Sequence, residues 1–230
     1  MRDLKDLEYL GGARIPGSGA ILGLYRHGEE FTLRVHDTEL MTSHVHQSED
    51  ALAQLACAKI ASAPEPVILI GGLGMGYTLA ATLKASGPAA RVIVAELIPG
   101  VVEWNRGLLA HLAGNPLADP RVSVRLQDVA LSLQTELAAF DAILLDVDNG
   151  PEGLTRHSND WLYSADGLSA AYSALRPNGV LAVWSATPDK GFAMRLRKLG
   201  FEVTEVRTAS SPDVRDDRHT IWLAVNRTTP

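Results

Sequence analysis

Cysteine is almost absent from this sequence: Cys57 is the single thiol in 230 residues. One thiol excludes an internal disulfide and a zinc site made of several cysteines. Cys57 lies in an apolar helical pattern, so we expect it in the protein core. Long apolar runs are missing too, since none approaches the roughly 18 residues of a membrane span. The charged N-terminal residues lack a signal-peptide core, and we therefore expect a soluble, cytoplasmic protein without membrane contact.

Basic residues are neither abundant nor clustered. Lysine and arginine number 21 against 27 aspartates and glutamates, which gives a formal net charge of −6. Because nucleic-acid phosphates are bound by clustered positive charge, we expect no nucleic-acid partner. The acidic balance is compatible with a pocket for a cationic small molecule.

The N-terminal segment differs from the rest of the chain. It contains short β-like runs at residues 20–25, 31–36 and 39–43. Separated by turn-like residues, these runs predict a small antiparallel hairpin element. Ser48 is then expected to cap a helix. We expect two parts, a small β element over residues 1–47 and an α/β domain over residues 48–230.

Strand-like and helical segments alternate from residue 67 onward. The strand-like segments are residues 67–70, 91–95, 122–125, 142–147 and 180–184, and the helical segments are residues 76–86, 99–112, 129–138, 160–175 and 188–199. Such alternation predicts a doubly wound α/β fold with a mostly parallel sheet. Two last strand-like runs, 201–206 and 220–225, predict a C-terminal antiparallel hairpin. This arrangement is similar to the Rossmann-like fold of methyltransferases.

The most specific motif follows the first of these strands. After Gly71, the glycines Gly72, Gly74 and Gly76 form a G-x-G-x-G pattern before a helix. Such a turn brings backbone N–H groups and a helix N-terminus close to a ligand. A dinucleotide fingerprint needs a further glycine where Tyr77 stands, which disfavours an NAD-dependent oxidoreductase. The tighter pattern resembles the nucleoside turn of S-adenosylmethionine-dependent transferases.

Two acids end the next two strands. Glu96 lies 20 residues after Gly76, where an acid in doubly wound folds accepts hydrogen bonds from a ribose diol. Asp128 lies where an acid can accept from the amine of adenine. Each acid can instead cap the helix that follows it. Leu97 and Val129, the next residues, complete the expected nucleoside-binding set.

A further acidic cluster follows the fourth strand. Asp146 and Asp148 lie at the carboxyl end of this strand, where open α/β sheets bind ligands. Two close carboxylates can hold an ammonium ion or share a proton. The alternative is that both acids form the turn before Gly150. Asn149 and Glu152 are further candidates for the same pocket.

The histidines give no metal-binding pattern. His44 and His46 lack the acid-and-histidine spacing of a metal-binding helix, so we expect no metal ion. Together with Gln47 they are expected on a lid between the N-terminal element and the sheet. Trp184 is expected in the core or on a pocket wall.

These motifs together resemble the spermidine synthase (polyamine aminopropyltransferase) family over about residues 20–206. The resemblance implies aminopropyl transfer from decarboxylated S-adenosylmethionine to a small-molecule amine acceptor. It implies that Glu96 binds the ribose, that Asp128 lies beside the adenine, and that Asp146 orients or deprotonates the attacking amine. The substrate-binding residues that it implies are Gln47, Glu49, Asp148, Asn149 and Glu152. It also implies a homodimer formed through the N-terminal hairpins.

The sequence departs from this family at four points, one of which is the absence of the family's later Pro-Thr-Tyr-Pro substrate segment. Gly74 stands where the family carries an aspartate that holds the ammonium of the aminopropyl donor. Ser48-Glu49-Asp50 replaces a Tyr-Gln-Glu segment, and Asn149 replaces a second strand-end aspartate. Because Gly74 does not repel a carboxylate, ordinary S-adenosylmethionine remains an alternative donor. The leading hypothesis is an aminopropyltransferase, and the alternatives are a small-molecule methyltransferase and a non-catalytic nucleoside-binding homologue.

Overall fold

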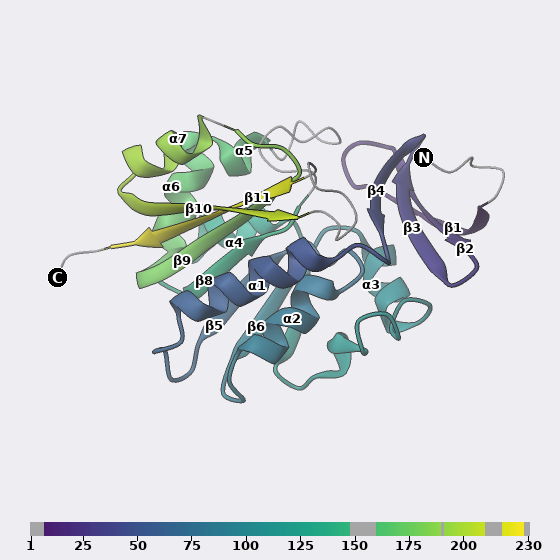
Figure 1. The fold of residues 1–230 in the computed structure, drawn as a ribbon, viewed down its shortest axis with the longest axis horizontal. Helices are drawn as coiled ribbons and strands as arrows, with labels where there is room; N and C mark the ends of the chain where they lie inside the picture. The colour runs from purple at the N-terminus through teal and green to yellow at the C-terminus, as the bar shows by residue number, and fades with distance from the viewer. Residues whose placement is uncertain (1–6, 148–159, 190, 210–217, 228–230) are drawn as a thin grey trace.

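The computed structural model describes residues 7–147, 160–189, 191–209 and 218–227, and its strands form two sheets (Figure 1). The N-terminal sheet consists of β1 (Glu8–Arg14), β2 (Ile21–His27), β3 (Glu30–Val35) and β4 (Thr38–Thr42). The larger sheet consists of β5 (Val67–Gly71), β6 (Arg91–Glu96), β7 (Val122–Leu126), β8 (Phe140–Leu145), β9 (Leu175–Ser185), β10 (Phe201–Ala209) and β11 (Arg218–Asn226). The helices are α1 (Gln47–Lys59), α2 (Tyr77–Ala85), α3 (Pro99–Arg106), the 3-10 turn η2 (Pro116–Ala118), α4 (Val129–Thr135), α5 (Asp160–Tyr163), α6 (Ala165–Ala174) and α7 (Phe192–Lys198).

The N-terminal sheet is an antiparallel meander of β1 to β4 in chain order. The last three strands fall on the predicted runs, whereas β1 lies before them, so the predicted hairpin element is one strand short. β1 contains Gly11 and Gly12, and its register against β2 shifts between Tyr9 and Gly11. These irregularities remove the alternation by which a strand is found in a sequence.

The larger sheet has the order β10-β11-β9-β8-β5-β6-β7. The strands from β5 to β9 pair in parallel, and β11 runs antiparallel to both of its neighbours, β9 and β10. The predicted fold class, a doubly wound and mostly parallel sheet with a C-terminal antiparallel hairpin, is confirmed.

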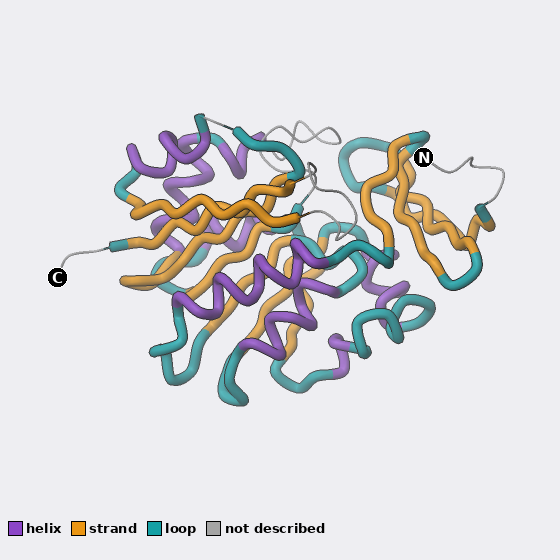
Figure 2. The backbone as a smooth tube through the Cα atoms, viewed as in Figure 1, coloured by secondary structure: helices purple, strands orange, loops and turns teal. Residues whose placement is uncertain are grey.

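Each central strand of the larger sheet is buried on both faces. In β5, Ile68 and Ile70 belong to the core on one side, and Val67 and Leu69 belong to the core on the other. Helices α1 and α2 cover the first face and α4 to α7 the second (Figures 1 and 2). Burial on both faces explains why these strands are continuous apolar runs in the sequence.

Two of the predicted helices differ from the observed ones. The segment predicted over 99–112 is helical only through α3, because Gly107 leaves the helical conformation with φ −125° and ψ −102°. The segment predicted over 160–175 divides at Ser164. The Ser164 hydroxyl accepts a 3.2 Å hydrogen bond from the backbone N–H of Gly167 and caps α6.

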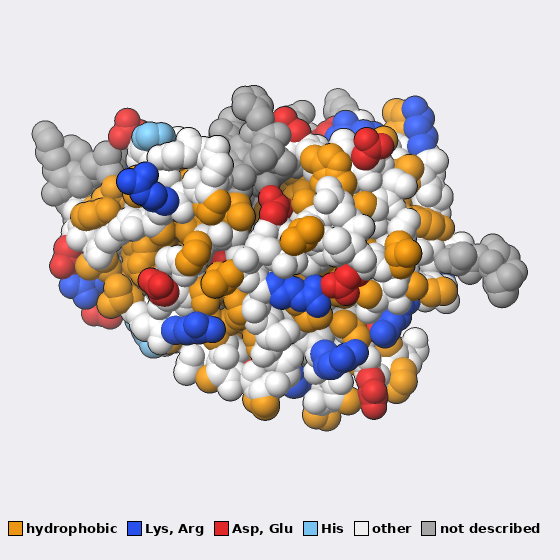
Figure 3. Space-filling view, turned by 180° about the vertical axis from the view of Figure 1, so that it is seen from behind, with side chains coloured by type: hydrophobic (Ala, Val, Ile, Leu, Met, Phe, Trp, Pro, Cys, Tyr) orange, Lys and Arg blue, Asp and Glu red, His pale blue; other side chains and the backbone are white. Residues whose placement is uncertain are grey.

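The burial of the cysteine and the distribution of surface charge agree with what the composition indicates. Cys57 is buried on α1 as predicted, and burial raises the pKa of its thiol to about 11. Acidic and basic side chains are interspersed over the face shown in Figure 3. Within the described ranges, no helix is long and apolar enough to cross a membrane.

The strand order reverses at β5, because β6 and β7 lie on one side of it and β8 and β9 on the other. Open α/β sheets bind ligands at such a reversal, outside the carboxyl ends of the strands. The N-terminal sheet is tied to this end of the molecule. Tyr77, the first residue of α2, donates a 2.7 Å hydrogen bond to the carbonyl of Ser43, directly after β4.

Candidate active site

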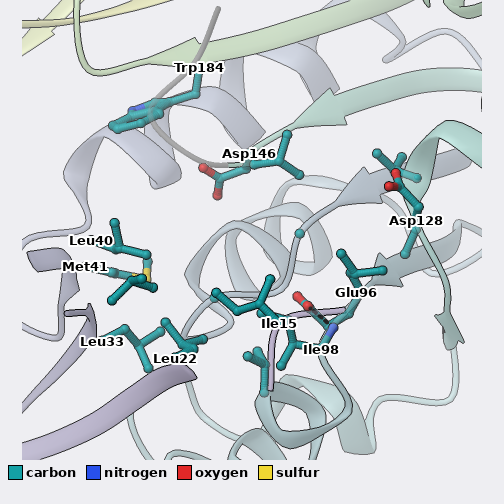
Figure 4. Close-up of a pocket in the computed structure, with 18 of the residues that line it drawn as sticks. Ile15, Leu22, Leu33, Leu40, Met41, Glu96, Ile98, Asp128, Asp146 and Trp184 are labelled. Atoms are coloured by element: carbon teal, nitrogen blue, oxygen red, sulfur yellow. Dashed lines mark hydrogen bonds between the residues drawn. The ribbon is translucent and has the colours of Figure 1, made fainter. Parts of the chain in front are cut away.

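A cavity lies between the N-terminal sheet and the carboxyl ends of β5, β6, β7 and β8 (Figure 4). The wall on the side of the N-terminal sheet is apolar. It consists of Ile15, Leu22, Leu33, Val35, Leu40 and Met41. The polar side chains on the other walls are Glu49, Glu96, Gln127, Asp128 and Asp146. An apolar wall with a few convergent polar groups is typical of a small-molecule site.

The glycine turn connects β5 to α2 beside this cavity. Gly72, Gly74 and Gly76 have φ values of 88°, 53° and 85°, a region that other residues rarely adopt. A Cβ atom on Gly72 would overlap the carbonyl oxygen of Asp146. Asn105 of α3 supports the turn, because its Nδ2 donates a 2.8 Å hydrogen bond to the carbonyl of Gly74. The turn therefore needs glycine both for its conformation and for its close approach to β8.

Glu96 is buried at the end of β6 and joins two loops. Its Oε2 accepts a 2.8 Å hydrogen bond from the N–H of Leu73, and its Oε1 accepts one of 2.8 Å from Ile98. Burial raises the pKa of Glu96, while the backbone N–H groups of Ile98, Leu73 and Leu97 oppose this rise. Each oxygen has a second lone pair, so these contacts are compatible with the predicted hydrogen bonds to a ribose diol.

Asp128 is the N-cap of α4. Its Oδ1 accepts a 2.9 Å hydrogen bond from the N–H of Ala130. Of the two roles that the sequence allows, the cap is observed, and the contact with adenine stays a prediction. Val129, the next residue, packs against Gly71 at the start of the glycine turn. A Cβ atom on Gly71 would lie only 3.0 Å from Val129 Cγ2.

Asp146 follows β8 directly and lies half-buried on the cavity wall. Its N–H donates a 3.0 Å hydrogen bond to the carbonyl of Gly71, which continues the pairing with β5. Its Oδ2 accepts a 2.5 Å hydrogen bond from the Thr78 hydroxyl. Burial raises the pKa of Asp146, and the bond from Thr78 opposes this rise. In Figure 4 the carboxylate points toward the space between Trp184 and Met41.

Glu49 of α1 is a second acid of the same cavity and is 7% exposed. Burial, followed by the negative charge of Asp146, raises the pKa of Glu49 to about 7. The Ser48 hydroxyl donates a 2.6 Å hydrogen bond to Glu49 Oε2 and lies 3.0 Å from Nδ1 of His219 on β11. The described pair of carboxyl groups is therefore Asp146 with Glu49, and the predicted partner Asp148 lies outside the described residues.

The start of α1 differs from the prediction. Its N-cap residue is His46, without a side-chain cap, and Ser48 lies in the first turn with a fully buried side chain. The His46 ring stacks on Tyr77 with centroids 4.1 Å apart, and its Nδ1 lies 3.0 Å from Asp50 Oδ2. Ser48 is therefore not a cap, and its hydroxyl is directed toward Glu49.

Most of the predicted site residues meet at this cavity. Those that line it are Glu49, Gly72, Gly74, Glu96, Leu97, Asp128, Val129 and Asp146. Gly71, Gly76 and Gln47 are not among the described residues that line it. The two glycines shape the turn, and Gln47 begins α1. Asp148, Asn149 and Glu152 lie outside the described residues. The binding and catalytic roles of all these residues remain predictions.

Thr78, Ser48 and His219 form hydrogen bonds behind the cavity wall, and the sequence does not predict their place there. Thr78 had a usable signal, because it lies in the first helical turn after the glycines, beside the next strand of the sheet. Ser48 and His219 are 171 residues apart, and no local pattern joins them. Trp184 lines the cavity, one of its two expected places. Its ring nitrogen is buried and has no hydrogen-bond partner among the described residues.

Comparison with known sequences identifies one family. The spermine/spermidine synthase domain family matches residues 46–190 of this chain. A polyamine aminopropyltransferase from Mycobacterium tuberculosis (strain H37Rv) is 31% identical over 126 residues, which are 53% of this chain and 23% of that protein. The match thus spans about a quarter of the length of the curated relative.

Solved structures share the fold. The crystal structure of spermidine synthase from Thermotoga maritima superposes with a TM-score of 0.75 at 19% identity, covering 96% of this chain and 74% of that chain. An S-adenosylmethionine-dependent O-methyltransferase from Thermotoga maritima gives a TM-score of 0.57 at 16% identity, and the superposition covers 80% of this chain and 66% of that chain. At these identities the likeness shows the fold, in agreement with the methyltransferase-like sheet.

Proposed function

This chain belongs to the spermine/spermidine synthase domain family, and we propose that it transfers an aminopropyl group from decarboxylated S-adenosylmethionine to an amine acceptor. The observation that carries the proposal is the convergence of the glycine turn, Glu96 and Asp146 on one cavity. The first two suit an adenosyl nucleoside, and the third suits an amine. The curated relative is named for this reaction.

The glycine turn and Glu96 form the proposed nucleoside side of the cavity. Gly72 and Gly74 leave backbone exposed to a ligand, because neither carries a side chain. Glu96 holds Leu73 in this turn through a 2.8 Å hydrogen bond, and its remaining lone pairs are to accept from the ribose hydroxyls. Asp128, on the neighbouring wall, is to accept from the adenine amine. These groups bind the nucleoside by hydrogen bonds and require no metal ion.

Asp146 and Glu49 form the proposed acceptor side. Two carboxyl groups in a covered cavity attract an ammonium ion. Asp146, held by Thr78, is to orient the amine nitrogen toward the methylene carbon next to the sulfonium. The amine lone pair forms the new C–N bond, the electron pair of the C–S bond goes to sulfur, and one amine proton is lost. The protein contributes alignment and the exclusion of water by the N-terminal sheet.

Gly74 supports an alternative donor. In the structure a Cβ atom at this position would lie 3.0 Å from Met41 Sδ and therefore face the cavity wall. Because the position carries no acid, it does not repel the carboxylate of ordinary S-adenosylmethionine. Methyl transfer to a small molecule is accordingly the second candidate function, and the fold likeness to an O-methyltransferase is compatible with it.

Calorimetry tests the nucleoside half of the proposal. The ligands are S-adenosylmethionine, its decarboxylated form, methylthioadenosine and NAD. We expect the decarboxylated form to bind more tightly than NAD. Tighter binding of NAD than of all three adenosyl-sulfur nucleosides would contradict the proposal. Mass spectrometry of the products then separates aminopropyl transfer from methyl transfer.

The oligomeric state remains a prediction from the family. We expect a homodimer formed through the N-terminal strands, located in the cytoplasm. Light scattering at micromolar concentration measures the mass in solution, and a monomer would contradict the expected dimer.

A further inference from the structure

Three side chains form a hydrogen-bonded line that leads from the cavity to the larger sheet. Glu49 lines the cavity and accepts a 2.6 Å hydrogen bond from Ser48 Oγ. Ser48 Oγ lies 3.0 Å from His219 Nδ1. Ser48 is fully buried, whereas His219 is half-buried near the start of β11. The Trp184 ring packs against the His219 ring at 4.7 Å between centroids and 65° between planes. The line thus joins the acceptor side of the cavity to a partly exposed imidazole.

We propose that Glu49 receives the proton lost by the acceptor amine, and that Ser48 and His219 carry this proton out of the cavity. The proposal rests on the proposed function, because it assigns a route to the proton that aminopropyl transfer releases. It gives Glu49 a catalytic role and gives Ser48 and His219 positioning roles.

The proton balance can be followed atom by atom. An acceptor R–NH3+ gives one proton to the Glu49 carboxylate and becomes R–NH2, whose lone pair then attacks the carbon next to sulfur. The Ser48 hydroxyl, which donates to Oε2 of the Glu49 carboxylate, turns toward Nδ1 of a neutral His219 once Glu49 is protonated. Glu49 then passes its proton from Oε2 to Ser48 Oγ, while the Ser48 hydroxyl proton moves to Nδ1. His219 then releases a proton from Nε2, and exchange of the remaining ring proton from Nδ1 to Nε2 through solvent restores the starting tautomer. Glu49 is a carboxylate again, and Ser48 again carries one proton.

The surroundings divide the work between the two cavity acids. Burial raises the pKa of Asp146, and the 2.5 Å hydrogen bond from Thr78 opposes this rise. Asp146 is therefore assigned to hold the cation by a fixed, hydrogen-bonded carboxyl group. Glu49 has a pKa of about 7, raised by burial and by the charges of Asp146 and Asp50, and lowered by Ser48. Tyr77 of α2 faces the same acids, and burial with the charges of Glu49 and Asp50 raises its pKa to about 12. Tyr77 therefore stays neutral when Glu49 exchanges its proton near neutral pH.

Steady-state kinetics across pH test this route. The variants are Glu49→Gln, Ser48→Ala, Ser48→Thr and His219→Gln, each checked for folding by thermal unfolding. The acceptor probes are 1,4-diaminobutane and butylamine, with decarboxylated S-adenosylmethionine as the donor. Glu103→Gln and His36→Asn serve as matched controls. Glu103 and His36 are exposed, and the left-handed φ of 52° at His36 is one that asparagine tolerates.

For the wild type we expect kcat/KM to rise with pH through an apparent pKa of about 7. Glu49→Gln is to lose this rise and to lower kcat by about 10²–10⁴-fold. Ser48→Ala and His219→Gln are to lower kcat by about tenfold, with the KM for the amine within about twofold, because neither residue is among the described residues that line the cavity. Ser48→Thr, which keeps the hydroxyl, is to restore most of the rate, and both controls are to match the wild type.

Results that would contradict the proton relay can be told apart from results that would contradict the proposed function. If the wild type transfers the aminopropyl group while Ser48→Ala and His219→Gln keep its kcat and pH profile, the relay is overturned and the proposed function stands. If the folded wild type transfers nothing to any amine, the proposed function falls and the relay falls with it. Where Ser48→Ala fails to fold, NMR titrations of the wild type and Ser48→Thr test the relay. They follow the Glu49 carboxyl carbon and the His219 ring over the same pH range, and we expect both to change together. A His219 ring that does not respond when Glu49 ionises would overturn the relay.

Discussion

The hydroxyl of Thr78 donates a 2.5 Å hydrogen bond to Oδ2 of Asp146. This bond joins the first turn of α2 to the carboxyl end of β8, across 68 positions of the chain. The glycines proposed to hold the nucleoside lie in the loop that leads from β5 into α2. Asp146 is therefore positioned by the helix that directly follows the loop proposed to bind the aminopropyl donor.

Removal of the Thr78 hydroxyl should change how Asp146 ionises. The hydrogen bond from Thr78 lowers the pKa of Asp146 against the effect of burial, so Thr78→Val should raise this pKa. We expect the Asp146 carboxyl carbon, followed by NMR as the pH is changed, to titrate at a higher pH in this variant than in the wild type. Thr82→Val is the control, because the Thr82 hydroxyl bonds to the carbonyl of Thr78 and not to Asp146. Identical titration curves for Thr78→Val and wild type would contradict the prediction.

The change Asp146→Asn keeps the shape of the side chain and removes its charge. We expect turnover to fall by about 10²-fold or more, because an amide neither attracts the acceptor ammonium nor orients its nitrogen for attack. Donor affinity should change little, since the nucleoside is assigned to Glu96 and the glycine turn. Initial rates and calorimetry give the two quantities separately. Asp166→Asn, an exposed position on α6, should behave as wild type. Full turnover in Asp146→Asn would remove Asp146 from the mechanism.

Glu96→Ala should weaken nucleoside binding by about 1.5–3 kcal/mol, the range for hydrogen bonds to a charged group. The same variant should unfold at a lower temperature, because the N–H groups of Leu73 and Ile98 lose their acceptor. Calorimetry with methylthioadenosine measures the first effect, and thermal unfolding without ligand measures the second. If affinity is unchanged while stability falls, Glu96 supports the turn and does not touch the nucleoside.

Glu49→Gln should change how stability depends on pH. The pKa of Glu49 rises from 4.5 to about 7 on folding, so between these values the folded chain keeps a proton that the unfolded chain has lost. The contribution of Glu49 to stability is therefore greatest below pH 4.5 and declines as the pH rises toward 7.

The glutamine variant lacks this decline. Compared with the wild type, it should gain roughly 2–3 kcal/mol of relative stability between the acid and the neutral end of this range. Urea unfolding of both proteins at each end measures the difference. An equal difference at both ends would show that Glu49 ionises normally in the folded protein.

The sequence predicts those parts of the fold that depend on local patterns. The continuous apolar run of β5 marks a strand buried on both faces, and the positive φ of Gly72 and Gly76 explains why glycine follows it. β1 was not predicted because its glycines and shifted register break the alternation. The predicted Ser48 cap is wrong, because the position of the cap depends on the backbone conformation at His46, which composition does not reveal.

The candidate site likewise has residues that local sequence predicts and residues that depend on long-range packing. Glu96 and Asp146 were predictable, because an acid at a strand end reaches the ligand edge of any open parallel sheet. The pairing of Glu49 with Asp146 depends on how α1 packs against the sheet, and the contact of Ser48 with His219 depends on where β11 returns. Long-range packing of this kind leaves no periodic signal in a single sequence.

Product analysis after incubation with decarboxylated S-adenosylmethionine and a panel of amines tests the proposed function most directly. We expect an amine that has gained one aminopropyl group, together with an equal amount of methylthioadenosine, and the loss of both products in Asp146→Asn. A methylated product formed from S-adenosylmethionine, with no aminopropylated amine from the decarboxylated donor, would contradict it.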